Sequence, residues 1–125
     1  MTLSHSSTPP VDDTRELLQL IAKDTGERLG YWANVSAILS CPVLFPPDDW
    51  RPTLVLANEA VTTLRAMQGC AKEAIRSFRK HRYDRCMREM EHLERLRPVV
   101  DSIDRKVKHK MRRYLMEGGD HDCRD

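Results

Sequence analysis

The chain has 125 residues, of which 40% are hydrophobic and 32% are charged, and its formal net charge at pH 7 is +2. This length fits one domain, and the balance of residue types is typical of long amphipathic helices and lies away from that of disordered chains. No apolar run approaches the roughly 18 residues that indicate a membrane span, so we expect no membrane partner.

The first ten residues are rich in Ser, Thr and Pro, with neither a basic start nor a hydrophobic stretch. They do not resemble a secretory signal, and we expect residues 1–12 to be a disordered lead-in and the protein to be cytoplasmic. In a reducing compartment the four cysteines, Cys41, Cys70, Cys86 and Cys123, are expected to be free thiols. A disulfide or a structural metal is the alternative.

The first predicted helix runs from about residue 13 to residue 39. Asp12, Asp13 and Thr14 offer a capping residue, and apolar residues then recur at intervals of three and four. Gly26 and Gly30 weaken the middle of this helix by about 1 kcal/mol each relative to alanine, which favours a bend or a close helix contact there.

The next segment, residues 40–52, is predicted to be a loop, because it contains four prolines and the pair Asp48-Asp49. It also carries Val43, Leu44, Phe45 and Trp50, which is unusual for a connector exposed to water. Two interpretations remain open: the loop folds back over one end of the molecule, or it is an apolar patch that binds a partner.

A second helix is predicted from about Thr53 to Lys80, with small residues that allow a neighbouring helix to approach closely. A third is predicted from Tyr83 to about Glu117, interrupted by Pro98, where a kinked continuous helix is favoured over a break into two. The pair Gly118-Gly119 is expected to end it and to leave residues 118–125 as a flexible acidic tail.

These elements predict an all-α fold, an antiparallel three-helix bundle over residues 13–117, or four helices if the third is split at Pro98. The third helix is the longest, roughly 50 Å against about 40 Å for the second. The difference leaves an apolar overhang, which a homodimer would cover.

The charge is divided along the chain. Residues 1–71 carry 5 basic and 8 acidic side chains, a net charge of −3, whereas residues 72–113 carry 15 basic and 7 acidic side chains, a net charge of +8. The basic residues form two groups. The turn patch is Arg76, Arg79, Lys80, Arg82, Arg85 and Arg88, and the C-terminal patch is Arg105, Lys106, Lys108, Lys110, Arg112 and Arg113.

Three interpretations of the basic residues remain open. They are a solvated helix surface, a contact to the phosphates of DNA or RNA, or a docking surface for an acidic protein. No helix-turn-helix spacing, zinc finger or aromatic RNA-binding signature distinguishes among them.

Catalytic and metal signatures are weak. No Gly-rich phosphate loop or nucleophile elbow is present. Glu89 and His92 have the spacing of one half of a di-iron motif, but the second copy is missing. His92 also lies beside, and not within, the stripe of apolar residues that recur at helical spacing along the third predicted helix. Cys70, His81 and Cys86 fall near one turn, with Cys123 or His121 as further ligands, but zinc ligands normally come in closer pairs. We therefore expect no enzyme activity, no cofactor and no metal.

The sequence favours a non-enzymatic interaction protein, an adaptor or inhibitor that binds a macromolecular partner. A compact inhibitor of an enzyme that handles nucleic acids would have such features. Direct DNA or RNA binding is the first alternative, and a metal-binding helical protein is the second. The residues expected to contact the partner are Arg76, Arg79, Lys80, Arg82, Arg85, Arg105, Lys108, Arg112, Arg113, Phe45 and Trp50.

Overall fold

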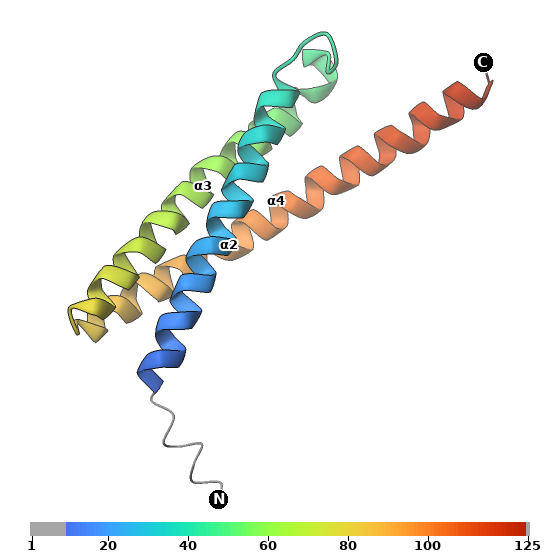
Figure 1. The fold of residues 1–125 in the computed structure, drawn as a ribbon. Helices are drawn as coiled ribbons and strands as arrows, with labels where there is room; N and C mark the ends of the chain where they lie inside the picture. The colour runs from blue at the N-terminus through green and yellow to red at the C-terminus, as the bar shows by residue number, and fades with distance from the viewer. Residues whose placement is uncertain (1–9, 125) are drawn as a thin grey trace, which may run out of the picture.

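The computed structural model describes residues 10–124, and it describes the side chains of residues 13–116. Within this range the backbone forms three α-helices, α2 (Pro10–Leu39), α3 (Pro47–Arg79) and α4 (Tyr83–Arg124). Figure 1 shows that α2 and α3 run in opposite directions, as do α3 and α4, and that the C-terminal end of α4 extends away from the other helices. The predicted all-α, antiparallel three-helix bundle is confirmed.

Helix α3 is the central element, because it packs against both α2 and α4. Four of its alanines, Ala57, Ala60, Ala71 and Ala74, are completely buried. Their small side chains allow close approach of both neighbouring helices, while larger apolar side chains fill the remaining space. The main core combines residues of all three helices, among them Trp32, Leu64 and Val100.

Helix α3 begins at Pro47, six residues before the predicted start at Thr53. The prediction that residues 40–52 form a loop is therefore wrong for its second half. A proline costs little at the first helical position, and Asp48 and Asp49 in the first turn interact favourably with the helix dipole. The consequence is that Trp50 belongs to a helix, which fixes the direction of its side chain.

Helix α4 continues through Pro98 without a break, so the three-helix alternative is correct and the split helix is not found in the described range. The side chain of Pro98 is exposed, and water can therefore satisfy the carbonyl group that a proline leaves without a donor. The helix also continues past Gly118 and Gly119 to Arg124, because glycine weakens a helix without requiring its end. At the other end, α2 begins at Pro10, inside the predicted lead-in, of which residues 1–9 lie outside the described range.

The turn between α3 and α4 is tight and has regular hydrogen bonds. The Arg82 N–H donates to the Ser77 carbonyl at 2.8 Å and the His81 N–H donates to the Phe78 carbonyl at 3.0 Å. This pair of bonds is the Schellman arrangement, in which the residue after the cap adopts a left-handed conformation. His81 occupies that position with φ of 60°, where glycine is usual.

Helix α2 packs into the main core through its apolar residues, and its polar side also lies near side chains of both other helices. A Cβ atom added at Gly26 would lie 3.3 Å from the side-chain amide nitrogen of Gln68 on α3, whereas Gly30 faces open space. The Arg28 guanidinium donates to the Asp101 carboxylate on α4 at 3.1 Å. This ion pair links α2 directly to α4, although both of these helices pack mainly against α3.

Candidate functional site

Aromatic rings gather where α3 begins and α4 passes. The ring centroids of Phe45 and Trp50 are 5.0 Å apart, and those of Trp50 and Tyr114 are also 5.0 Å apart, both in edge-to-face geometry. The Lys110 ammonium lies 5.1 Å from the centroid of the Trp50 ring. Edge-to-face pairs and a cation over an indole are both favourable, so this cluster fastens α4 to the start of α3.

Because Trp50 is buried in this aromatic cluster, its side chain is not exposed to a partner. Only 3% of Trp50 is exposed, and Phe45 is half-buried against the main core. The sequence leaves two interpretations of the apolar loop open. The side chains of Phe45 and Trp50 agree with the first, in which the loop folds back over the end of the bundle. Their burial stabilises the fold, because it removes large aromatic surfaces from water.

Other apolar side chains at the same end remain exposed. Val43 and Leu44 precede Phe45 and are 87% and 61% exposed, and Leu115 and Met116 follow Tyr114 and are 65% and 66% exposed. A hollow at this end is lined by Asp49, Trp50, His109, Lys110, Arg113 and Tyr114. Exposed apolar groups therefore lie next to basic ones where α4 leaves the bundle.

The C-terminal patch borders this apolar surface. Lys108 pairs with Asp104 at 2.9 Å, one turn before it on the same helix. Among residues 13–116, no ion pair involves Arg105, Lys106 or Arg112. All three side chains are exposed, so their charges face solvent and are available to a partner.

The turn patch lies at the opposite end of the bundle and is more closely paired. Glu73 accepts from Arg76 at 3.0 Å and lies 3.7 Å from Arg85. Arg79, Lys80 and Arg82 are exposed and line two shallow hollows beside the turn.

The two patches are separate surfaces. Arg85 and Arg105 are about 30 Å apart along α4 at 1.5 Å per residue. The segment between Arg88 and Arg105 carries five acidic side chains against two arginines. The turn patch and the C-terminal patch are therefore two positive regions with an acidic region between them.

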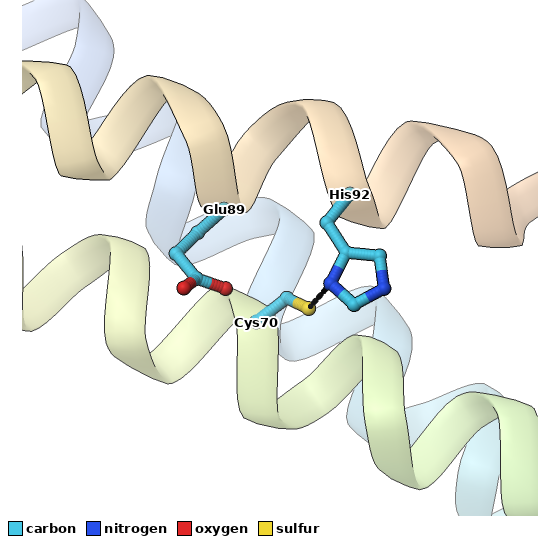
Figure 2. A group of neighbouring side chains, drawn as sticks. All are labelled: Cys70, Glu89 and His92. Atoms are coloured by element: carbon cyan, nitrogen blue, oxygen red, sulfur yellow. Dashed lines mark hydrogen bonds between the residues drawn. The ribbon is translucent and has the colours of Figure 1, made fainter.

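A second candidate site joins α3 to α4 in the middle of the bundle. The ligand atoms of Cys70, Glu89 and His92 all lie within 4.8 Å of one another, and the Cys70 Sγ is 3.4 Å from the His92 Nδ1. Figure 2 shows the Cys70 thiol of α3 directed at the His92 imidazole of α4, with the Glu89 carboxylate of α4 nearby. Cys70 is buried, Glu89 is half-buried and His92 is exposed, so the cluster reaches from the core to the surface.

The environment of Cys70 holds its thiol in the protonated form. Burial raises the pKa of this thiol, and the hydrogen bond to Glu89 and the negative charge of that carboxylate raise it further. Nucleophilic cysteines need the opposite, a lowered pKa in an electropositive site. The cluster therefore does not fit a cysteine nucleophile, and its donor set of one sulfur, one nitrogen and carboxylate oxygens is of the kind that binds metals.

Sequence reasoning missed this cluster because it assigned the three residues to two different hypotheses. Spacing along the chain groups Cys70 with His81 and Cys86, and Glu89 with His92. In the structure Cys86 packs in a separate core cluster with Leu18 and Phe78, and the His81 Nδ1 lies 2.7 Å from the Tyr83 hydroxyl, so neither joins Cys70.

The feature of the sequence that predicts this cluster is the position of the turn at His81. Cys70 and His92 are each eleven residues from His81, and residues equally distant from a tight turn face each other in an antiparallel helix pair. Cys123 and His121, the other ligands considered, lie outside the described side chains.

Comparison with known proteins does not define a family: no protein-family model, no curated protein and no solved structure matches the chain. Among the described residues, none of the helices combines the length and apolar character needed to cross a membrane.

Proposed function

We propose that this chain is a non-enzymatic interaction protein that binds an acidic segment of a partner protein at the end of the bundle where α4 projects. The binding surface consists of Arg105 and Arg112 of the C-terminal patch and the exposed apolar residues Leu44, Leu115 and Met116. The proposal departs from the sequence-based hypothesis in two ways. It replaces the buried Trp50 with these exposed residues, and it leaves the turn patch outside the interface.

The observation that carries the proposal is the combination of exposed apolar side chains with exposed cations at one end of the molecule. Leu115 and Met116 are about two-thirds exposed and follow Arg112 by three and four residues, about one turn of α4. Protein interfaces combine an apolar, desolvated centre with a polar rim, and Arg and Met are enriched in them. A partner segment with acidic and apolar side chains on one face complements this surface.

Nucleic acid is the second candidate, and a separate observation favours it. At 100° per residue, the cations between Arg105 and Arg113 are spread over all sides of α4 except the buried stripe, as in a helix that lies between two phosphate backbones. Such binding needs no apolar contact, so it leaves the exposure of Leu115 and Met116 unexplained. We therefore rank the protein partner first.

The two candidates differ in which substitutions weaken binding. We would titrate the full chain with three fluorescent probes, a synthetic helical peptide with Glu on one face and Leu on the other, a short duplex DNA and a short single-stranded RNA. The variants are Arg105→Glu/Arg112→Glu and Leu115→Ser/Met116→Ser. The matched controls are Arg79→Glu/Arg82→Glu in the turn patch and Leu17→Ser/Leu20→Ser on α2, where both leucines are more than half exposed.

For a protein partner, both test variants weaken peptide binding about tenfold or more, a change of about 1.4 kcal/mol, and both controls leave it unchanged. For nucleic acid, only the basic variant weakens binding, and the wild-type affinity falls steeply with salt. Peptide binding that is equally strong in the wild type and both test variants would contradict the proposal. Light scattering on the same samples tests the homodimer, since a dimer formed through the overhang dissociates in Leu115→Ser/Met116→Ser.

A further inference from the structure

We infer that Cys70, Glu89 and His92 form a zinc site that clamps α3 to α4. The site would hold the ion with the Cys70 Sγ, one Glu89 carboxylate oxygen and the His92 Nδ1, and would leave one position to water. This inference is independent of the proposed interaction surface, and it replaces the expectation from the sequence that no metal is bound.

The geometry already approaches that of a zinc site. With Zn–S of about 2.3 Å and Zn–N of about 2.0–2.1 Å, the two donor atoms of a tetrahedral site lie about 3.5 Å apart. The Sγ and Nδ1 atoms are 3.4 Å apart. The Glu89 carboxylate lies within 4.8 Å of both atoms, so a rotation of its flexible side chain completes the third contact.

The donor types select the class of metal. A thiolate is a soft ligand that Mg²⁺ and Ca²⁺ do not favour, whereas zinc accepts sulfur, imidazole nitrogen and carboxylate oxygen together. A thiolate, a carboxylate and a neutral imidazole also balance the two positive charges of the ion. When zinc binds, the Cys70 thiol releases its proton to solvent and the three side-chain donors replace waters of the hydrated ion.

The surroundings are compatible with a cation. Two cationic groups on the same two helices, Arg76 and Arg85, are held by Glu73, one turn from Cys70. Because His92 is exposed, the ion has a path from solvent to the buried sulfur. Helix register supports the arrangement as well, since Glu89 and His92 are three residues apart and lie on one face of α4.

The test uses the full chain, stripped of metal, with zinc chloride in competition with a chelating dye and with cobalt chloride as a spectroscopic probe. We expect one ion per chain and a thiolate-to-cobalt charge-transfer band. Cys70→Ala and His92→Ala should each weaken zinc binding at least about 100-fold, the upper end of the effect of losing an outer-shell partner. Both should also abolish the charge-transfer band.

Matched controls separate the site from its neighbours. Cys86→Ala removes another buried thiol and His109→Ala another histidine of α4, and both should bind zinc as the wild type does. Glu89→Gln is the least disruptive test of the cluster, and it should weaken binding about tenfold or more with unchanged helix content.

Two results would overturn the inference. The first is a wild-type chain that takes up no zinc and shows no cobalt band. The second is zinc binding of wild-type strength in folded Glu89→Gln and in either Cys70→Ala or His92→Ala.

Discussion

Replacing Trp50 with alanine tests whether the Pro-rich segment belongs to the core. The side chain is 3% exposed and contacts Phe45, Tyr114 and Lys110. Burying roughly 200 Å² of indole at about 25 cal/mol per Å² stabilises the fold by about 5 kcal/mol as an upper bound. Measured Trp→Ala changes in cores cost about 3–5 kcal/mol. We therefore expect Trp50→Ala to lower the free energy of unfolding by about 4 kcal/mol.

The measurement is urea unfolding followed by far-UV circular dichroism, which does not depend on tryptophan fluorescence. Trp50→Phe keeps an aromatic ring in the cluster and should cost only about 1.5 kcal/mol. Leu44→Ala is the matched control from the same connector, and because Leu44 is 61% exposed its substitution should change stability by no more than about 0.5 kcal/mol. The reasoning fails if Trp50→Ala costs less than about 1 kcal/mol, and the indole would then return to the candidate binding surface.

Four further predictions concern stability. His81→Gly should raise the free energy of unfolding by about 1 kcal/mol, since glycine adopts the left-handed conformation without steric cost; an unchanged or lower value in urea unfolding contradicts this. Pro98→Ala should stabilise α4 by up to about 3 kcal/mol in the same assay, and a loss of stability would show that the proline is needed. Arg28→Ala should cost less than about 1 kcal/mol, because the pair with Asp101 is partly exposed, and the cost should shrink in high salt. Burial raises the pKa of Cys86 above its ordinary value of 9.0, so the unfolded chain loses this proton first and stability falls as the pH rises above 9; Cys86→Ala should show a smaller alkaline loss, and equal losses would refute the assignment.

The helices could be predicted from the sequence because their buried positions follow the helical period. Ala57, Leu64, Ala71 and Phe78 are seven residues apart, and all four are buried on α3. The start of α3 could not be predicted, because proline is compatible with the first helical position as well as with a loop. What decides the outcome is the burial of Trp50 against Tyr114, a contact between residues 64 positions apart in the chain.

The two candidate sites differ in how far the sequence reveals them. Lysines and arginines outside the apolar stripes are expected to be exposed, and Arg105 and Arg112 are. The exposure of these arginines does not identify their partner, because an exposed cation is stable in water without any partner. Cys70 and His92 lie opposite each other because of the register between α3 and α4. This register can be predicted from the sequence only when the turn is known to lie at His81.

The order in which the helices pack has a consequence for how the chain folds. Because α3 packs against the helices that directly precede and follow it, the core forms largely from contacts between neighbours in the chain. Such low contact order is associated with folding in microseconds to milliseconds, since little loop-closure entropy is lost before contacts form. A nascent chain can therefore assemble the α2–α3 hairpin as soon as Arg79 has left the ribosome. The step that completes the aromatic cluster at Tyr114 comes last, and we expect it to limit the rate.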